Sequence, residues 1–242
     1  MNNFGRHFDG FPLPPADYGY WFDFMSEHEI GHASNSTVGL FTAISSGTNA
    51  IIDTPAGGWM RIANNGTSED SGGNWQVSAA NIALAASGGR TITFMSRHTI
   101  SDVDQCDFQA GLSVLDASWF ASAPTDGFYF SLADGAATLD FTVRAASATV
   151  LSKTAVATVT DATAFDLCIR LTPSGTTGIV SRIEAWVGAG TRGVIPTLVV
   201  DEQVSTVAPL ATIMMTSGLA WQSGAAAAQT CDTDFLGVRV IR

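Results

Sequence analysis

The run RTITFMSRHTISDVDQCDFQAGLSVLD, residues 90–116, carries the pattern that decides the fold. From Phe108 to Val114, every second residue is apolar and the residues between are polar or small. Successive side chains of a strand point to opposite faces of a sheet, so this alternation places the large apolar groups on one side. Residues 91–96 alternate in the same way, and an acidic turn follows them. We therefore expect residues 91–96 and 107–114 to be antiparallel neighbours in one half-buried sheet.

The same alternation recurs along the chain from residue 37. It is most regular in Thr138–Arg144 and Phe165–Thr172, and Asp134-Gly135 predicts a hairpin between residues 128–132 and 138–144. Polar loops are expected at 64–74 and 117–127. Further strands are expected at 37–44, 48–53, 58–63, 154–160, 179–187, 197–200, 211–216 and 234–241. Many short strands predict an antiparallel sandwich or barrel. We expect two sheets packed face to face, with these residues inside: Phe94, Phe108, Leu112, Phe141, Leu167 and Ile169.

Composition bounds the partners of the chain. Its 242 residues are 46% hydrophobic and only 14% charged, against roughly 25% charged residues in an average soluble domain. The surface is therefore either a neutral skin or one that partner subunits cover. The net charge is −11 and Lys153 is the only lysine, so no basic footprint for DNA or RNA exists, and an anionic membrane is disfavoured.

The chain has three cysteines, Cys106, Cys168 and Cys231, an odd number, and they are far apart in the sequence. This predicts free thiols, which suits a reducing compartment. The first residues contain no apolar signal region, and no apolar run approaches membrane-spanning length.

Residues 1–21 differ from the rest because aromatic residues are interspersed with proline and glycine. Such an arm cannot form its own core, and proline at this density blocks helix and interior strand. The arm is either disordered or docked on this domain or a neighbouring subunit. Docking is favoured, because a disordered tail is usually poorer in aromatics. The expected assembly contacts are Phe4, Phe8, Phe11, Tyr18 and Tyr20, and residues 22–242 form a single β-sandwich domain.

His28-Glu29-Ile30-Gly31-His32 matches the H-E-x-x-H pattern of zinc proteases, in which a helix presents two histidines to the metal. Gly31 interrupts such a helix, and Asn35 and Val38 stand where a metzincin has glycine and a third histidine. We expect a chance match and no metal here.

No other constellation predicts catalysis. Asp102, Asp104 and Asp107 lack the glycine and glutamate of a known calcium loop, so a solvated turn is expected. The glutamates do not have the spacing of sandwich-fold glucanases, and no G-x-S-x-G occurs. We therefore expect no catalytic residues and no cofactor. Trp59, Trp75, Trp119 and Trp221 could stack on sugar rings as loop aromatics, or be buried at the sandwich edge or in a subunit contact.

Seven short motifs, taken in order, resemble a known group. They are GGWMRI (57–62), GRTITF (89–94), DVDQ (102–105), FQAGL (108–112), TDGFYF (125–130), IEAWVG (183–188) and DFLGV (234–238). The order is similar to that of concanavalin A-like jelly-roll proteins of tailed bacteriophages, a group of virion structural proteins that includes capsid decoration (cement) proteins. The resemblance covers roughly residues 22–242. It departs at 187–190, where Val-Gly-Ala-Gly replaces the Val-Asp-Gly turn, so no role of that aspartate carries over.

The resemblance implies an all-β, lectin-like jelly-roll sandwich with an extended N-terminal arm. It implies a non-enzymatic protein that binds the major capsid protein and stabilises the outer capsid lattice, on a virion assembled in the host cytoplasm. Proteins of this kind are commonly trimers, so a homotrimer is expected, with the arm reaching a neighbouring chain or the capsid. The alternative is a glycan-binding, lectin-like module on the virion, and a sandwich-fold glycoside hydrolase is third.

Overall fold

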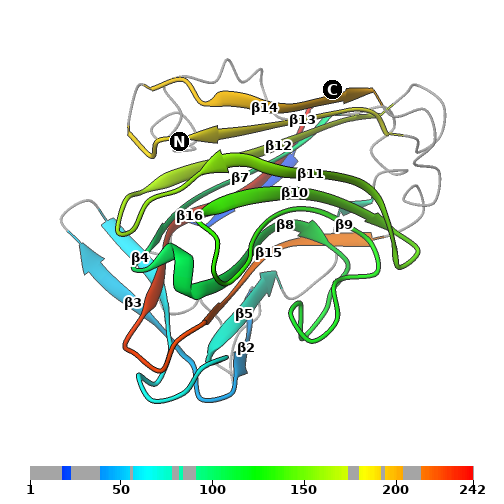
Figure 1. Ribbon diagram of the computed structural model, residues 1–242. Helices are drawn as coiled ribbons and strands as arrows, with labels where there is room; N and C mark the ends of the chain where they lie inside the picture. Colours follow the sequence, from blue (N-terminus) through cyan, green and yellow to red (C-terminus); the bar gives the residue numbers. More distant parts are fainter. Residues whose placement is uncertain are drawn as a thin grey trace.

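A computed structural model describes residues 18–22, 39–54, 57–77, 82–83, 91–173, 180–191, 194–203 and 214–241 (Figure 1). Almost all of its regular structure is β-strand, as the alternation predicts. The strands are β1 (Tyr18–Phe22), β2 (Gly39–Ile44), β3 (Thr48–Thr54), β4 (Gly57–Ala63), β5 (Gly72–Val77), β6 (Ile82–Ala83), β7 (Thr91–Ile100), β8 (Cys106–Ser113), β9 (Gly127–Leu132), β10 (Thr138–Ala145), β11 (Ala148–Thr158), β12 (Phe165–Pro173), β13 (Val180–Gly188), β14 (Thr197–Gln203), β15 (Met214–Ser223) and β16 (Thr230–Ile241). One 3-10 turn, η3 (Val103–Gln105), joins β7 to β8.

The strands form two antiparallel sheets that lie face to face (Figure 1). Sheet A has the order β14-β13-β12-β7-β16-β4-β3, and β1 also pairs with β16. Sheet B has the order β11-β10-β9-β8-β15-β5-β2, and β6 also pairs with β15. The predicted two-sheet antiparallel sandwich is confirmed.

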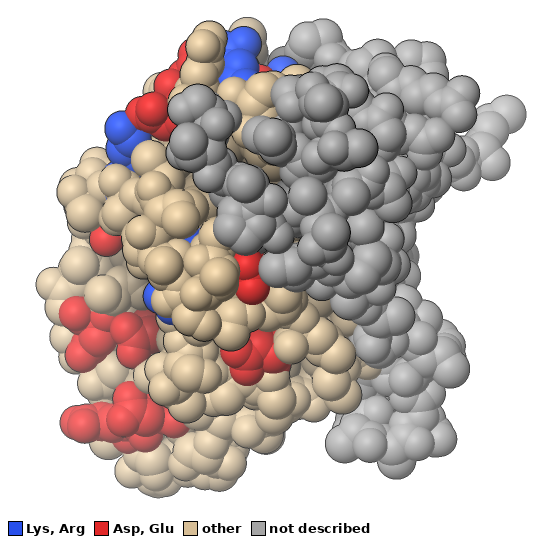
Figure 2. Space-filling model, turned by 90° about the vertical axis from the view of Figure 1, so that its right-hand side faces the viewer, with Lys and Arg blue, Asp and Glu red and all other residues tan. Residues whose placement is uncertain are grey.

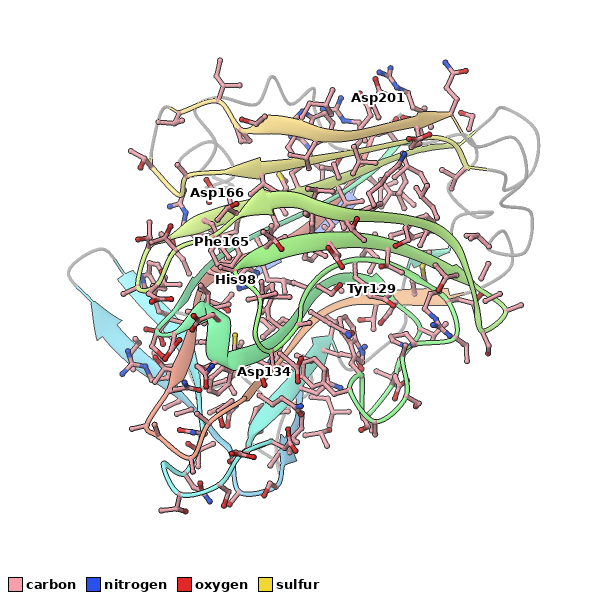
Figure 3. All side chains as sticks on the ribbon, in the orientation of Figure 1. His98, Tyr129, Asp134, Phe165, Asp166 and Asp201 are labelled. Atoms are coloured by element: carbon pink, nitrogen blue, oxygen red, sulfur yellow. The ribbon has the colours of Figure 1, made fainter. Side chains whose placement is uncertain are left out.

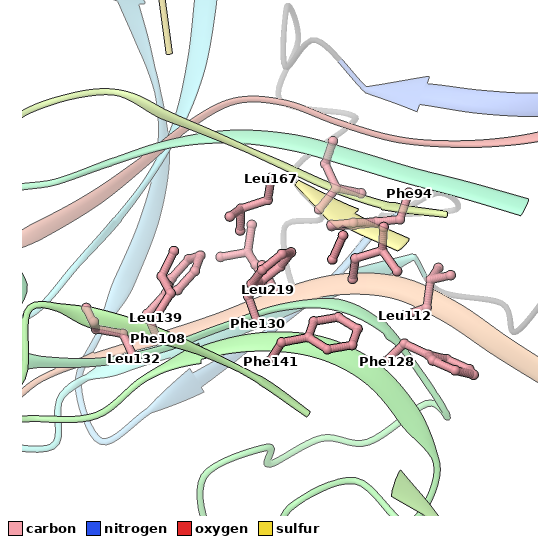
Figure 4. Packing of buried hydrophobic residues seen from close by; sticks show 14 of the residues in the cluster. Phe94, Phe108, Leu112, Phe128, Phe130, Leu132, Leu139, Phe141, Leu167 and Leu219 are labelled. Carbon is pink, nitrogen blue, oxygen red and sulfur yellow. The ribbon is translucent and has the colours of Figure 1, made fainter. Parts of the chain in front are cut away.

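The hydrophobic core lies between the sheets, and all six predicted core residues are 0% exposed. Figure 4 shows Phe94 and Leu167 of sheet A facing the aromatic residues of sheet B. Phe130 and Phe141 pack edge to face with ring centroids 5.2 Å apart. Burying a side chain of this size stabilises the fold by about 1.5–3 kcal/mol. This core therefore fixes which face of each strand points inward.

The predicted pairing of residues 91–96 with 107–114 is wrong. β7 lies in sheet A between β12 and β16, whereas β8 lies in sheet B between β9 and β15. Between them the chain crosses from one sheet to the other through η3, where Val103 is buried and its N–H donates to Asp161 Oδ1 at 2.8 Å. Alternation identifies the buried face of a strand but not the strand beside it. Both runs do face the core, but from opposite sheets.

The remaining differences concern strand extents. The Asp134-Gly135 hairpin is confirmed, with Gly135 at φ +80° and Asp140 opposite Ser131. The predicted loop at 64–74 ends earlier, because Gly72 and Gly73 open strand β5. A Cβ on Gly72 would lie 2.0 Å from the carbonyl oxygen of Trp221, so only glycine allows β15 this close. β15 also continues to Ser223, through polar and small residues that the sequence pattern does not identify as strand.

The end of the N-terminal arm belongs to the sandwich. β1 pairs with β16, and Tyr18 lies opposite Val240 and Tyr20 opposite Val238. The boundary expected between residues 21 and 22 therefore falls inside a strand of sheet A. Phe4, Phe8 and Phe11 lie outside the described residues. In the described part of the chain, no helix has the length and apolarity needed to cross a membrane.

A polar group interrupts the core near η3. His98 points inward from β7, close to Phe165 of β12 (Figure 3). Its Nδ1 lies 2.9 Å from Thr233 Oγ1 and its Nε2 lies 2.8 Å from Ser96 Oγ. Burial lowers the pKa of His98 to about 3, so the ring is neutral at physiological pH. The two hydroxyls satisfy both ring nitrogens, which makes a buried imidazole tolerable.

The outer face of sheet A carries an ion-pair cluster over aromatic rings. Arg97 Nε donates to Asp166 Oδ1 at 2.7 Å, and Arg97 Nη1 donates to Asp234 Oδ2 at 3.3 Å. The guanidinium of Arg97 lies 5.4 Å from the ring centroid of Phe235. Arg97 and Asp166 are 7% and 6% exposed, so this pair is buried and each charge depends on its partner.

Candidate functional site

The outer face of sheet B, turned away from the core, carries the polar residues that complement the apolar alternation. In Figure 1 this sheet is arched, and the loop 114–126 between β8 and β9 lies on its hollow side. Strand register sets the residues of this face in rows. The first row contains Asp140, Ser131, Gln109, Ala220 and Asn74. The second row contains Thr142, Tyr129, Gly111, Gly218 and Gln76.

The loop 114–126 covers the end of this face that lies over β5 and β15. Asn74 Nδ2 donates to the carbonyl oxygen of Asp116 at 2.6 Å, and the N–H of Asp116 donates to Gln76 Oε1 at 2.9 Å. At the base of the loop, the N–H of Val114 donates to the carbonyl oxygen of Asp126 at 3.0 Å. Asn74 and Gln76 are each 2% exposed as a result. These two side chains therefore hold the loop instead of facing solvent.

Trp119 of this loop lies against Tyr129, with ring centroids 6.2 Å apart. Trp119 is 0% and Tyr129 4% exposed, and burial raises the pKa of the Tyr129 hydroxyl. The two glycines of the second row keep the floor beside Tyr129 flat. A Cβ on Gly111 would lie 2.7 Å from Tyr129 Cα, so a side chain at that position would displace β9.

The part of the face over β8, β9 and β10 is open. Gln109, Ser131, Asp140, Thr142 and Arg144 are all half-buried, and together they present amide, hydroxyl, carboxylate and guanidinium groups. Gln109 Oε1 is buried and has no hydrogen-bond partner among the described residues; the same is true of Asn74 Oδ1 and Trp119 Nε1 under the loop. A buried polar atom without a partner is costly, so these atoms need water or ligand hydroxyls.

The carboxylates of this face are engaged with the chain itself. Asp107 accepts from Gln222 Nε2 at 2.9 Å and from the N–H of Asp134 at 3.1 Å. Asp140 Oδ1 accepts the N–H of Ala155 at 2.8 Å, where β11 bulges and Ala155 has φ +53°. Asp126 Oδ1 accepts the N–H of Ala146 at 2.8 Å.

Of the described glutamates, Glu69 is exposed in the loop before β5, and the other two lie away from this face. Glu184 lies on the outer side of sheet A with Arg170 and Arg182, and Glu202 pairs with Lys153. Hydrolysis of a glycosidic bond needs two carboxyl groups free to act on either side of it. The carboxylates of Asp107, Asp126 and Asp140 each accept a backbone N–H of the chain, and Asp107 also accepts from Gln222.

The expectation that four loop tryptophans could stack on sugars is corrected for three of them. Trp75 and Trp221 are strand residues of the core, and both are 0% exposed. Trp119 does lie in a loop, but it is fully buried against Tyr129. A buried tryptophan removes a large apolar area from water, and this stabilisation of the fold accounts for Trp75, Trp119 and Trp221. Trp59 is half-buried on β4, apart from the outer face of sheet B.

The segment His28–His32 lies outside the described residues. Within the described part of the chain, no group of three or more His, Cys, Asp or Glu side chains is arranged to hold a metal ion. Burial, followed by the hydrogen bond and charge of Asp104, raises the pKa of Asp102.

Figure 2 shows acidic side chains spread over the lower part of the described surface, and most of the Lys and Arg near its top.

Comparison with known proteins gives the fold but no family. No family model and no curated protein sequence matches the chain. Lectin II from Ulex europaeus superposes with a TM-score of 0.60 at 13% identity, over 94% of this chain and 100% of that chain. Peanut lectin superposes at 0.56 and 13% identity, over 92% and 97%. Endo-β-1,4-glucuronan lyase from the fungus Trichoderma reesei superposes at 0.51 and 8% identity, over 93% and 95%.

These superpositions establish a lectin-like jelly-roll sandwich, and at such low identities they establish nothing finer. The same fold carries both binding proteins and enzymes, so the residues of the site must decide between them. Sequence reasoning found Gln109 only as the polar partner in an alternating run and did not single it out. A glutamine midway along an otherwise small polar face is the signal that could have drawn attention to it.

Proposed function

We propose that this chain is a non-catalytic glycan-binding module whose ligand lies on the open half of the outer face of sheet B. The observation that carries the proposal is the buried, unpartnered Gln109 Oε1 between Ser131 and Ala220. Sugar hydroxyls donate and accept hydrogen bonds, so they match a floor of amide and hydroxyl groups. The lectin-like fold supports the same proposal.

The ligand we propose is a neutral glycan. Asp140 lies in the Gln109 row, Asp107 lies in the next row of the same face, and the chain as a whole carries a net charge of −11. Carboxylates or sulfates on the ligand would approach these side chains as like charges and be repelled. An uncharged sugar meets no such penalty.

The test is a glycan array followed by calorimetric titration of the best neutral ligand. Gln109→Ala should weaken binding by about tenfold, because it removes hydrogen bonds together worth about 1.4 kcal/mol. Gln105→Ala is the matched control, since Gln105 lies in η3 and its side-chain amide donates to the carbonyl oxygen of the neighbouring Asp104 at 3.0 Å. Equal affinities for both variants, or no neutral glycan bound, would overturn the proposal.

A second candidate is a structural subunit of a phage virion that binds the major capsid protein. A specific observation supports it: a segment next to β14 exposes large apolar side chains, with Ile195 75% exposed, on a chain with only 14% charged residues. Such surface is typical of protein contacts. Mass spectrometry of purified particles should then find this chain at a fixed ratio to the capsid protein. Its absence from intact particles, with recovery from the soluble lysate, would contradict this role.

A further inference from the structure

The first row on the outer face of sheet B runs from a covered end to an uncovered one. At the covered end, Asn74 of β5 and Ala220 of β15 are 2% and 0% exposed. Beyond them, Gln109, Ser131 and Asp140 are all half-buried. Exposure therefore rises from β5 toward β10, and Gln109 is the first residue of its row that is partly exposed.

The other end of the face is open to solvent. β11 is the edge strand of sheet B beside β10, and its Ser152 lies opposite Thr142 of the second row. Ser152 is exposed, and so are residues 148–150 of the same strand. A ligand that lies over β8, β9 and β10 can therefore continue past β11 into solvent.

The loop 114–126 closes the covered end, and contacts within the loop support its bonds to β5. The N–H of Ser118 donates to Asp116 Oδ1 at 2.9 Å, and the N–H of Ser122 donates to the carbonyl oxygen of Ser118 at 3.3 Å. Trp119 is fully buried beneath the loop. These contacts make the loop a built part of the site, and a ligand at Gln109 meets it as a barrier on the β15 side.

We propose that the site binds the terminal sugar residue of a neutral glycan and excludes interior segments; this rests on the proposed function. The terminal residue lies at Gln109 and Ser131, and the rest of the glycan runs over β10 and β11. An interior residue at Gln109 would have to continue in both directions, and one of them is occupied by the loop 114–126. Such a clash against the wrong ligand is a common source of specificity.

Strand spacing sets how much of the glycan the face can contact. From β8 to β11 the row crosses three interstrand spacings, or about 14 Å in total. That length accommodates the terminal residue and a short stretch behind it. Affinity should therefore stop rising once a glycan is long enough to reach β11.

The first experiment compares short glycans with polymers of the same sugar. The probes are maltohexaose, xylohexaose, mannohexaose and galactohexaose, each titrated calorimetrically beside its parent polysaccharide at equal mass concentration. A polysaccharide carries fewer ends per sugar residue than a hexaose. Binding to the polymer should therefore be weaker per sugar residue, by the ratio of the ends that the two carry.

The outcomes separate this inference from the proposed function. Equal binding of polymer and hexaose per sugar residue, lost in Gln109→Ala, would overturn the recognition of ends and leave the glycan site intact. If none of the four hexaoses binds, the glycan site and the recognition of ends are both overturned.

The second experiment removes the barrier. The double variant Asn74→Ala, Gln76→Ala lacks both side chains that hold the loop, so an interior segment can displace it and the preference for hexaose should disappear. Gln229→Ala is the matched control, since Gln229 is also buried, at 4% exposed, but lies beside Asp102. It should keep the wild-type preference, and circular dichroism should show both variants folded. A folded double variant with an unchanged preference would contradict the role of the loop.

Discussion

The imidazole of His98 and the ring of Phe108 meet edge to face across the core, with centroids 4.9 Å apart and planes at 69°. His98 belongs to sheet A and Phe108 to sheet B, so this contact joins the two layers. The partners of the ring nitrogens, Thr233 and Ser96, both lie in sheet A. The imidazole therefore contacts both sheets, and its charge state bears on how they pack.

Stability should fall as the pH is lowered through the titration range of His98. The folded-state pKa is about 3, below the ordinary value of 6.5, so the unfolded chain binds the proton first. The stability is fully present above about pH 6.5 and is lost progressively toward pH 3. One proton corresponds to about 1.4 kcal/mol per pH unit. Urea unfolding between pH 6 and 5 should show a shallower slope for His98→Gln than for the wild type, and equal slopes would contradict this prediction.

Phe141 and Thr142 are neighbours on β10 that point to opposite sides of sheet B. Phe141 is 0% exposed and packs on Phe130, whereas Thr142 is half-buried on the outer face. Phe141→Ala should reduce the free energy of unfolding by about 3–5 kcal/mol, because it leaves a cavity in the core. Thr142→Ala should change it by less than about 0.5 kcal/mol. Chemical denaturation followed by circular dichroism checks both, and similar losses would mean that the facing of β10 is wrong.

Removing Arg97 should be costly in a way that removing Arg182 is not. Arg97→Ala leaves the carboxylate of Asp166 buried without its partner, and a broken buried pair costs about 3–5 kcal/mol. Arg182→Ala removes a solvent-exposed pair with Asp201, and water replaces that interaction with little effect on stability. Thermal unfolding of the two variants at one pH makes the comparison. A small effect of Arg97→Ala would show that water reaches Asp166.

The three cysteines should be unreactive in the folded protein. Burial raises the pKa of Cys106 and of Cys168 to about 12, and raises that of Cys231 well above its ordinary value. The thiolate is the reactive form, and almost none is present at neutral pH. A colorimetric thiol reagent should label no cysteine in the native chain and all three after denaturation. Rapid labelling of one native thiol would contradict its buried position.

The sequence predicted the strands and their buried faces well, because alternation reports burial directly. Phe108 and Leu112 of β8, and Leu167 and Ile169 of β12, point inward as expected. The neighbour of each strand could not be predicted in the same way. Nothing in residues 91–116 distinguishes a hairpin from a crossing between sheets, and the buried Val103 in η3 is the feature that decides it.

The site was harder to predict than the fold. Trp75 and Trp221 follow Gly, Asn and Ala residues that are typical of loops, so their place in central strands was missed. The partners of Asn74 and Gln76 lie in the loop 114–126, about forty positions further along the chain. Such contacts follow from the packing of sheet and loop, and no local pattern announces them.

The position of β15 and β16 has a consequence for synthesis. β15 lies between β8 and β5 in sheet B, and β16 lies between β7 and β4 in sheet A, so residues 214–241 supply a middle strand to both layers. Until the ribosome has released them, each layer consists of two separate pieces with unpaired edges. A nascent chain that lacks β15 and β16 therefore cannot complete either sheet, and its unpaired strand edges favour aggregation. We expect each layer to close only after residues 214–241 have left the ribosome, and ribosome stalling before residue 214 to leave a chaperone substrate instead of a partial domain.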